Sequence, residues 1–504
     1  MRELLLGIDI GTSSCKCAVF DPEGAVLAAR TAEYEVFRPK AFWAEQAPED
    51  WAEAVFSCIR SIFAETDVLP GEISGIGIDG QSWSAIPMDK DGNVLAKTPI
   101  WMDMRSQSIC DRLNREIGEE AIFACAGNPL TPSYSTAKVT WFKENRPDIY
   151  PKIDKILQSN SYLVYRLTGL LSQDKSQGYG LHCFDMRTGT WNMDMAKALG
   201  IEERFLPEIF SCDEVVGGVT EEAAALTGLL IGTPVVAGGL DAACGTLGAG
   251  VFLDGDTQEQ GGQAGGMSIC IEDYAADPRL ILSFHVVPDR WLLQGGTTGG
   301  GGAMRWFEAN FADFERNNGG KPSLVQLNEI AEKIPAGSEG LIFLPYMSGE
   351  RTPIWDPKAK GVFYGLDFGK TKGHFVRALM EGVAFSLKHN LDTAEGAGAK
   401  VGALRAMGGS ANSLLWTQIK ADVTGKEIIV PSSDTATTLG AAILAGIGTG
   451  IYSSYEEAVK KTVKDQRKHE PDLTNRAVYD KTYETYLELY QALKGTMHKG
   501  GEEA

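Results

Sequence analysis

The sequence lacks the patterns that identify membrane proteins, secreted proteins and cysteine- or histidine-based metal sites. No apolar stretch in its 504 residues approaches the ~18 residues that a membrane-spanning helix needs. The N-terminus has no basic segment followed by a long apolar run and a cleavage site, so we expect no signal peptide. The nine cysteines include no CxxC pair, and the six histidines form no HExxH motif. These absences predict a cytoplasmic protein that does not enter a membrane.

Positive charge is also scarce. The chain has 47 Lys and Arg residues against 67 Asp and Glu residues, which gives a formal net charge of −20. A protein this acidic is not expected to bind nucleic acid or an anionic membrane. If it binds a polyphosphate, backbone amides and a divalent cation must supply the positive charge locally.

Length and composition indicate a globular protein with more than one core. A chain of 504 residues is too long for a single hydrophobic core, so its length alone predicts two large domains, with three as the alternative. Its 43% hydrophobic and 23% charged residues are ordinary for such a protein, and 58 glycines suit many tight loops.

The first segment that indicates chemistry lies at the start, in residues 4–24. An apolar run ends in Asp9, and the small and hydroxyl residues Gly11, Thr12 and Ser13 follow before a second apolar run. This pattern predicts a β-hairpin whose tip can surround a phosphate with N–H groups and hydroxyls. Asp9, at the end of a buried strand, is placed to hold a metal ion or its water. Nucleotide-dependent phosphoryl transfer is therefore the first hypothesis.

The predicted elements alternate between strands and helices and fall into two similar halves. The first half has predicted strands at 4–10, 15–20, 25–35 and 71–80, a helix at 48–65, helix-rich sequence from 106 to 210, and a strand and small-residue helix within 233–250. The second half repeats glycine turns between strands and helices at 258–273, 290–307 and 404–425, and ends in a helix-rich tail at 465–497. We interpret these as two α/β lobes that face each other across a cleft.

Ten segments in order resemble the FGGY family of carbohydrate kinases, within the actin/hexokinase/Hsp70-like ATPase superfamily. Residues 133–145 are similar to the first family signature, with Lys138, Trp141 and Asn145 in register. Residues 361–381 are similar to the second signature, with a departure at Leu379. The similar segments are GIDIGTSS, WAEQAPEDW, IGIDGQSWSAIPMD, IWMDMR, SYSTAKVTWFKEN, YLVYRLTG, VVAGGLDAACG, FLPYMSGERTP, GVFYGL and MGGSANSLLWTQIKADVTG. The branch that looks most similar is the pentulose, xylulokinase-like one.

The resemblance implies an α/β fold of two ribonuclease-H-like domains that flank a catalytic cleft. Residues 1–252 would form the N-terminal, sugar-binding and catalytic domain, and residues 253–504 the C-terminal, ATP-binding domain. Closure of the two lobes over both substrates would exclude water and favour transfer to the sugar over hydrolysis. The implied substrates are ATP and a small sugar, with Mg²⁺ as cofactor. For assembly, the family precedent is a homodimer.

Asp241 is the predicted catalytic residue. A sugar hydroxyl is a poor nucleophile, so a carboxylate must accept its proton as the phosphoryl group arrives. Asp241 follows a buried strand and opens a helix, whose terminal amides favour the anionic form. Without the family match, the same residue is equally well explained as a plain helix N-cap.

The predicted metal and phosphate ligands lie in two glycine loops. Asp9 is expected to organise Mg²⁺ through water, with Asp241 beside it, while the alternative is a turn-forming Asp. The predicted phosphate ligands are Gly11, Thr12, Ser13, Gly262, Gln263, Gly265 and Thr297. Family members usually have Gly-Thr-Ser-Gly in the second loop, where this chain has Gly-Gln-Ala-Gly, so a hydroxyl is missing. Thr297 and Thr298 are candidates to replace it.

A third glycine turn resembles the adenosine-binding turn of the family. Gly408, Gly409 and Asn412 stand at the start of a helix, where glycine lets the backbone approach a nucleotide closely and the Asn side chain offers polar contacts. The alternative is an ordinary strand–helix turn.

The predicted sugar pocket combines polar groups for hydroxyls with an aromatic wall for C–H faces. Its predicted residues, which the resemblance places toward the substrate, are Gln81, Ser82, Trp83, Trp101, Asp103 and Arg105. Trp101 and Asp103 alternate on a strand-like segment and so can point into one cleft. The alternative makes Trp101 a core residue and Asp103–Arg105 a surface pair.

The chain departs from both well-defined sugar pockets of the family. Glycerol kinases have Arg-Glu after the glutamine that matches Gln81, and xylulokinases usually have Met-His, whereas this chain has Ser82-Trp83. We expect an ATP-dependent kinase acting on a ketopentose such as xylulose, with a deoxy sugar or a polyol as other acceptors. The rival interpretation is a non-catalytic sugar- or ATP-binding regulator, or an ATPase switch of the same superfamily.

Overall fold

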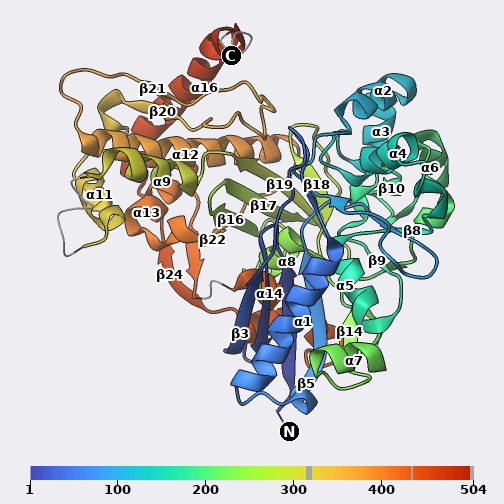
Figure 1. Ribbon diagram of the computed structural model, residues 1–504. Helices are drawn as coiled ribbons and strands as arrows, with labels where there is room; N and C mark the ends of the chain where they lie inside the picture. The colour runs from blue at the N-terminus through green and yellow to red at the C-terminus, as the bar shows by residue number, and fades with distance from the viewer. Residues whose placement is uncertain (1, 314–320, 433–434, 500–504) are drawn as a thin grey trace.

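The computed structural model describes residues 2–313, 321–432 and 435–499. Within these residues the chain forms two seven-stranded mixed sheets with helices on their faces, the α/β architecture that the sequence predicts (Figure 1). None of the helices in the described ranges has the combination of length and apolar character needed to span a bilayer.

The first sheet belongs to the first half of the chain and has the strand order β13-β14-β5-β1-β2-β3, with β15 paired to β5. Its strands are β1 (Leu4–Ile10), β2 (Ser14–Phe20), β3 (Val26–Glu33), β5 (Ile73–Gly80), β13 (Val215–Gly218), β14 (Pro234–Val236) and β15 (Gly239–Leu240). The helices of this half are α1 (Pro48–Glu65), α2 (Gln107–Ile117), α3 (Glu119–Ala126), α4 (Ser135–Asn145), α5 (Ser159–Thr168), α6 (Met193–Leu199), α7 (Glu221–Thr227) and α8 (Asp241–Gly248).

The second sheet repeats this topology with later strands in the order β24-β23-β22-β16-β17-β19-β18. These are β16 (Thr257–Gly261), β17 (Gly265–Ile271), β18 (Ile281–Phe284), β19 (Trp291–Thr297), β22 (Leu404–Met407), β23 (Ile428–Pro431) and β24 (Asp465–His469). The helices of this half are α9 (Gly301–Phe311), α11 (Ser323–Glu332), α12 (Lys372–Gly396), α13 (Leu414–Thr424), α14 (Ala436–Gly448), α15 (Tyr455–Thr462) and α16 (Arg476–Lys499).

Corresponding strand pairs run in the same sense in the two sheets. β1 and β16 each form an antiparallel hairpin with the next strand, around the first and second glycine loops. Each of them also pairs in parallel with a strand from much later in the chain, β5 and β22 respectively. The recurrence of glycine turns in the sequence therefore reflects two structural units of the same topology.

Short strands pair outside the two main sheets and shape the connections. They are β4 (Glu45–Gln46), β6 (Ile86–Met88), β7 (Thr98–Pro99), β8 (Lys155–Leu157), β9 (Gln173–Asp174), β10 (Phe184–Asp185), β11 (Thr190–Trp191), β12 (Ile209–Phe210), β20 (Ile342–Leu344) and β21 (Val362–Tyr364). One predicted element is corrected here, because residues 465–469 of the supposedly helical tail form the edge strand β24, and α16 begins only at Arg476.

The period-two pattern of β1 explains how the first sheet is covered. Leu4, Leu6 and Ile8 belong to a core cluster with residues of α1, whereas Leu5 belongs to a second cluster with residues of α14. Asp9 has the same parity as Leu5, so the alternation directs it to the α14 side of the sheet.

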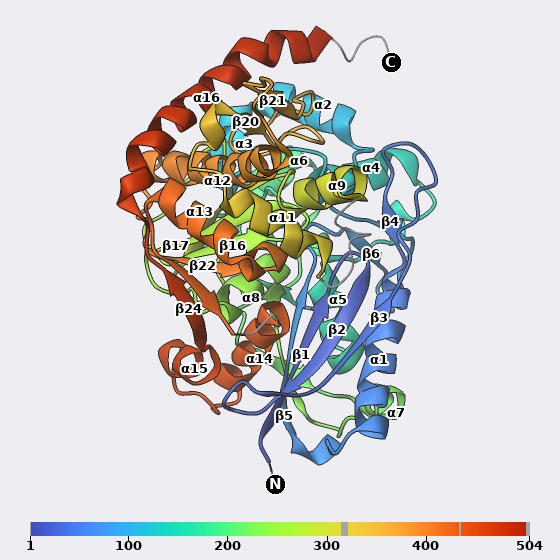
Figure 2. The same cartoon turned by 90° about the vertical axis from the view of Figure 1, so that its left-hand side faces the viewer.

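Helix α14 packs closely against the first sheet, although it comes from the second half of the chain (Figure 2). Gly7 and Gly77 are register partners on β1 and β5, and a Cβ atom on Gly77 would lie only 1.8 Å from the carbonyl oxygen of Ala441. Side chains at these positions would push the helix off the sheet. α14 also packs against α8, the helix that Asp241 begins.

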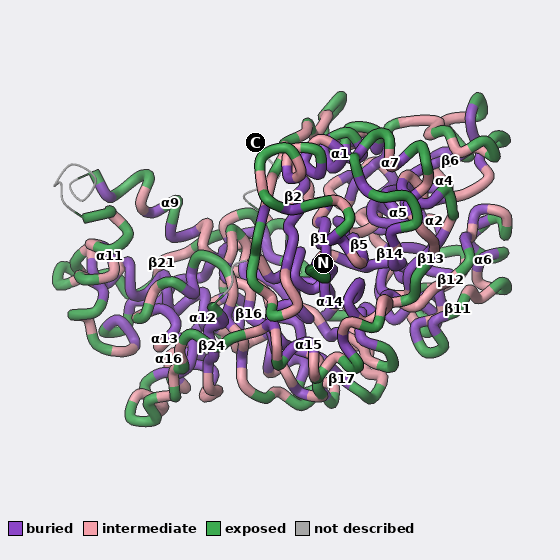
Figure 3. The backbone as a smooth tube through the Cα atoms, turned by 90° about the horizontal axis from the view of Figure 1, so that it is seen from below, coloured by how far each residue is buried: buried purple, intermediate pink, exposed green. Residues whose placement is uncertain are grey.

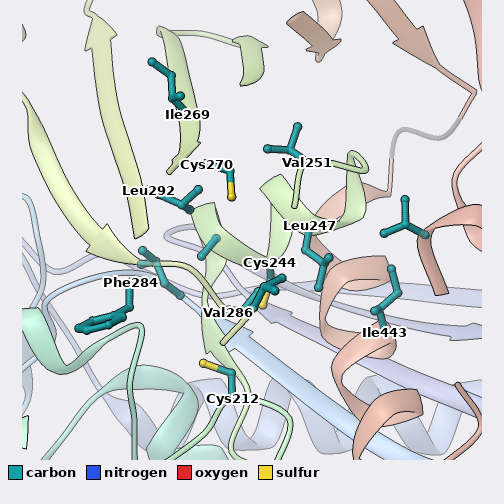
Figure 4. Packing of buried hydrophobic residues seen from close by; sticks show 14 of the residues in the cluster. Cys212, Cys244, Leu247, Val251, Ile269, Cys270, Phe284, Val286, Leu292 and Ile443 are labelled. Carbon is teal, nitrogen blue, oxygen red and sulfur yellow. The ribbon is translucent and has the colours of Figure 1, made fainter. Parts of the chain in front are cut away.

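A buried cluster joins the two halves behind this contact (Figure 4). Its members include Cys212, Cys244, Leu247, Val251, Ile269, Cys270, Phe284, Val286, Leu292 and Ile443. Buried residues concentrate in the interior between the helices and exposed ones at the periphery (Figure 3). Side chains of β1 and β17, which flank the first and second glycine loops, belong to this cluster. The opposite face of β1 packs against α1.

Candidate active site

Two cavities meet at the start of α8. The first has a volume of about 350 Å³ and the second about 510 Å³. Both are lined by Asp241, Ala242, Gln260 and Ala264. Because the first contains the predicted sugar-binding aromatic residues and the second the predicted nucleotide loops, we call them the acceptor cavity and the nucleotide cavity.

The acceptor cavity draws its walls from both halves of the chain. The first half contributes Thr12, Ser82, Trp83, Trp101 and Tyr179. Residues of the second half that line it include Met267, Ile281, Gln294, Arg351 and Thr352. The structure therefore brings three of the six predicted sugar-pocket residues, Ser82, Trp83 and Trp101, to one cavity.

Trp83 forms the aromatic wall of this cavity. Its ring lies 4.2 Å from the ring of Tyr134 and 5.8 Å from that of Tyr179, measured between centroids. Its backbone has a φ of 60°, which is uncommon for a bulky residue. Its indole nitrogen is buried and has no hydrogen-bond partner among the described residues.

Trp101 connects the acceptor cavity to the predicted first phosphate loop. Its indole N–H donates to the hydroxyl oxygen of Thr12 at 3.0 Å. Gln46 donates to the carbonyl oxygen of Thr12 at 2.8 Å and accepts from the Gln81 amide at 2.8 Å. Gln81 is buried beneath this loop and is absent from the described lining of both cavities.

Asp103 and Arg105 do not reach the cavity, contrary to their predicted orientation. Both Asp103 oxygens accept hydrogen bonds, from the Ala44 and Arg105 backbone N–H groups and from the Arg105 guanidinium. That guanidinium also pairs with Glu45 at 2.8 Å and stacks on Trp43, 3.6 Å from its centroid. With its side chain 3% exposed, Arg105 is fully engaged inside the protein. The pair is therefore buried, and the alternative of a surface pair is also wrong.

Asp241 occupies the junction of the cavities as the first residue of α8. One carboxylate oxygen accepts from the backbone N–H of Ala242 at 2.6 Å, so the side chain also serves the helix start. Burial in the cleft, with a smaller effect of the Asp9 charge, raises the pKa of Asp241 to about 7. A carboxylate with such a pKa is suited to accept a proton near neutral pH.

Asp9 lines the nucleotide cavity and has a buried carboxylate as its neighbour in the sheet. Its register partner on β5 is Asp79, which is 0% exposed and whose two oxygens lack hydrogen-bond partners among the described residues. Burial, and then the charges of Asp9 and Asp241, raise the pKa of Asp79 well above its usual range.

These carboxylates suit a magnesium ion. Within the described part of the chain no three His, Cys, Asp or Glu residues converge on a metal position. Mg²⁺ does not require such a cage, because it takes one or two carboxylates together with water and phosphate oxygens. Asp9, on the wall of the nucleotide cavity near Asp241, supplies a donor of this kind.

The glycine loops surround the nucleotide cavity. Gly11, Gly262 and Gly408 line it, and Gly265 lines the acceptor cavity. Gly408 has a φ of 84°, and a Cβ atom there would lie 3.0 Å from the carbonyl of Gly261, so the third turn abuts the second loop only as glycine. The remaining predicted residues of these turns, Ser13, Gln263, Gly409 and Asn412, are exposed beside the cavity rather than among its described lining residues.

Thr297 and Thr298 do not replace the missing hydroxyl. The Thr297 hydroxyl donates to Glu350, and the Thr298 hydroxyl donates to the carbonyl of Gly349 at 2.6 Å. Glu350, whose pKa burial raises to about 7, also accepts from the backbone N–H groups of Thr298 and Arg351. These bonds fix the end of β19, so neither hydroxyl is available to a phosphate in this arrangement.

Sequence reasoning missed several residues of the site. They are Asp79, Tyr179, Gln260, Gln294 and Arg351. Asp79 had a signal, because a carboxylate ends a buried strand beside the strand of Asp9. The other four had none, since a cavity wall made by two halves depends on how the halves face each other.

A carboxylate at the junction of an acceptor cavity and a nucleotide cavity, between two sheets of the same topology, defines a phosphotransferase with the actin-like ATPase fold. Residues 4–248 match the N-terminal domain of the FGGY family of carbohydrate kinases, and residues 275–449 match its C-terminal domain. The chain belongs to this family and is a sugar kinase.

Individual relatives agree on the fold and differ in their sugar. A xylulose kinase of Bacillus subtilis is 30% identical over 492 residues, 97% of each chain. A gluconokinase of Bacillus licheniformis is 29% identical, covering 98% of this chain and 97% of the relative. The crystal structure of xylulose kinase from Rhodospirillum rubrum superimposes with a TM-score of 0.90 and 30% identity, covering 98% of this chain and 100% of the other. The resemblance to the family and the predicted fold are confirmed.

Proposed function

We propose that this kinase transfers the γ-phosphoryl group of ATP to a hydroxyl of a ketopentose such as xylulose. The observation that carries the proposal is the position of Asp241 on the walls of both cavities. A base there reaches a hydroxyl bound on one side and faces a phosphate held on the other. Similarity to xylulose kinases supports the choice of a ketopentose.

In the proposed mechanism, the sugar lies against Trp83 and Trp101, with its reacting hydroxyl directed at Asp241. Asp241 accepts the hydroxyl proton while the oxygen attacks the γ-phosphorus in line with the leaving oxygen. The amides of the first and second glycine loops donate to the phosphate oxygens. When bound, Mg²⁺ supplies positive charge that neutralises those oxygens, and Asp9 is the residue proposed to hold it.

The two halves have separate roles in this proposal. Residues 1–252 form the sugar-binding and catalytic domain, and residues 253–504 form the ATP-binding domain with the adenosine turn at Gly408, Gly409 and Asn412. Since both halves line the acceptor cavity, the second half also contributes to sugar selection.

Gluconate is a second candidate acceptor. One relative is a gluconokinase, and Arg351 lines the acceptor cavity with a guanidinium that has no ion-pair partner among the described residues. A guanidinium binds a carboxylate in a bidentate manner, which a neutral ketopentose cannot offer.

An ADP-release assay over pentuloses, hexuloses, polyols and gluconate tests both candidates. We expect the highest kcat/KM with a ketopentose. A preference for gluconate that Arg351→Met removes would support the second candidate instead. ADP release that no acceptor stimulates would contradict the proposed function.

A further inference from the structure

Lys138 is a buried cation that the proposed mechanism does not use. It lies on α4 with 0% exposure, and no carboxylate forms an ion pair with it in the described ranges. An isolated buried charge is costly unless polar groups compensate it. Something in its surroundings must therefore stabilise the ammonium group.

Three carbonyl oxygens provide that compensation. The Lys138 ammonium donates to the carbonyls of Trp83 at 2.9 Å, Ile100 at 2.8 Å and Ser133 at 2.5 Å. An ammonium group has three N–H donors and no acceptor, so each donor has one carbonyl. The match between donors and acceptors is complete.

The three carbonyls come from separate segments, two of which line the acceptor cavity. Trp83 itself forms the aromatic wall, and Ile100 directly precedes Trp101. Ser133 directly precedes Tyr134, whose ring stacks on Trp83. Lys138 thus contacts the backbone of Trp83 itself and the backbone directly before Trp101 and Tyr134.

The backbone of Trp83 needs such a restraint. Its positive φ of 60° is a conformation that side chains other than glycine adopt at a cost, and it persists only where the surroundings enforce it. The hydrogen bond to Lys138 holds the peptide carbonyl that follows this φ angle. Burial lowers the pKa of Lys138 to about 7, and the charge of the Asp103 carboxylate opposes this shift. The three carbonyl hydrogen bonds favour the charged ammonium in addition to Asp103.

We propose that Lys138 is a positioning residue for the acceptor pocket: it fixes the Trp83, Ile100 and Ser133 carbonyls and thereby sets the spacing of the Trp83 and Trp101 rings. The inference rests on the proposed function, since it assigns Lys138 to the sugar side of the same reaction. It also predicts that the KM for the acceptor depends on Lys138 and that the KM for ATP does not. The nucleotide loops lie on other segments and do not contact it.

The test compares Lys138→Met, which keeps the length of the chain but no donor, with Lys138→Gln, which keeps two donors. Lys143→Met on the exposed side of the same helix is the matched control. We expect Lys138→Met to raise the KM for the acceptor by about tenfold or more, because a misplaced pocket loses binding in proportion to lost contacts. Lys138→Gln should show a smaller rise, and the KM for ATP should stay within about twofold in both.

Urea unfolding of the same variants separates positioning from a purely structural role. An acceptor KM unchanged in a folded Lys138→Met protein would overturn the proposal. So would a parallel rise of both KM values, or aggregation of both variants, because either result assigns Lys138 to folding alone. A wild-type protein that phosphorylates no sugar contradicts the proposed function before any variant is measured.

Discussion

Asp241 combines a structural position with the chemical task proposed for it. Its carboxylate accepts an N–H bond at the start of α8 and still lines both cavities. Asn at this position can accept the same N–H bond but cannot take a proton from a hydroxyl. The substitution therefore separates the two tasks.

Asp241→Asn should lower kcat by about a thousandfold or more, because positioned general bases contribute about 10²–10⁴ to rate. ATP binding should remain, since the glycine loops are unchanged. Sugar-dependent ADP release and calorimetric ATP titration measure the two quantities. Near-normal turnover in this variant would remove Asp241 from the reaction.

The pH dependence of the wild-type rate follows from the same residue. Only the ionised carboxylate accepts a proton, and its pKa is raised to about 7. We expect kcat/KM to rise with pH and to level off near or below pH 7, because a bound cation favours the ionised form. A rate that falls between pH 5 and 7 would be inconsistent with a carboxylate base.

The raised pKa also affects stability without ligands. The folded protein binds the Asp241 proton more tightly than the unfolded chain, so this contribution is complete below pH 4 and is lost as the pH rises through about 7. Asp241→Asn should therefore stabilise the ligand-free fold at pH 8 by about 1 kcal/mol, after allowance for screening in the open cleft. Urea unfolding at pH 4 is the control, where the two proteins should match.

Residue-level prediction from the sequence put a side chain at a cavity where one segment contains the whole signal. Asp241 stands at a strand–helix junction and Asp9 at a strand end, and the structure puts both on the cavity walls. It failed for Asp103 and Arg105, because their partners Glu45 and Trp43 come from a distant segment. Their alternation on a strand-like stretch did not reveal that the Trp43 segment covers them.

At the scale of elements, β16 and α13 are joined by a buried ion pair next to the second and third glycine turns. Lys420 donates to Glu259 at 2.6 Å and to the Ser410 hydroxyl at 2.7 Å, with both charged side chains at most 4% exposed. Glu259 precedes the predicted second phosphate loop, and Ser410 belongs to the predicted adenosine turn. The pair therefore ties together two parts of the predicted nucleotide site.

Lys420→Met should destabilise the fold by about 3–5 kcal/mol, because it leaves the Glu259 carboxylate buried without a partner. The double variant Lys420→Met/Glu259→Leu should recover most of that stability. We expect its KM for ATP to remain raised, since the tether is still missing, while its KM for the sugar stays normal. If the double variant recovers both its stability and a normal KM for ATP, the pair has a structural role only.

Element prediction was accurate for the hairpins and weaker at the end of the chain. The glycine loops between apolar runs gave both β1–β2 and β16–β17. The tail strand β24 was missed because Asp465–His469 is entirely polar and charged, and as an edge strand it buries little. Only its pairing with β23 identifies it.

For the whole molecule, the contact between α8 and α14 is where the two halves meet behind the catalytic residue. A Cβ atom on Gly440 would lie 1.9 Å from the carbonyl oxygen of Cys244, in the helix that begins with Asp241. Backbone atoms cannot rotate away from a methyl group as a side chain can. The relative position of the halves therefore depends on this crossing.

Gly440→Ala should lower the free energy of unfolding by about 1–3 kcal/mol through overpacking, and should lower kcat because α8 moves. Gly396→Ala at the end of α12 is the matched control, because a Cβ atom there meets nothing within 4 Å. Urea unfolding and steady-state kinetics give both readouts. If Gly440→Ala and Gly396→Ala have the same free energy of unfolding and the same kcat, the contact between α8 and α14 tolerates displacement.

The return of α14 to the first sheet has a consequence for synthesis on the ribosome. β1 and β5 are complete once residue 80 has been made, but the helix that covers one of their faces ends at Gly448. At typical translation rates the nascent sheet would wait roughly 20–70 s before α14 covers this face, which is glycine-rich on β1 and β5 and also carries Leu5 and Phe20. A truncated transcript that stops before codon 436 should therefore yield a product that is less soluble than the full chain, because Leu5 and Phe20 lose the helix that packs over them.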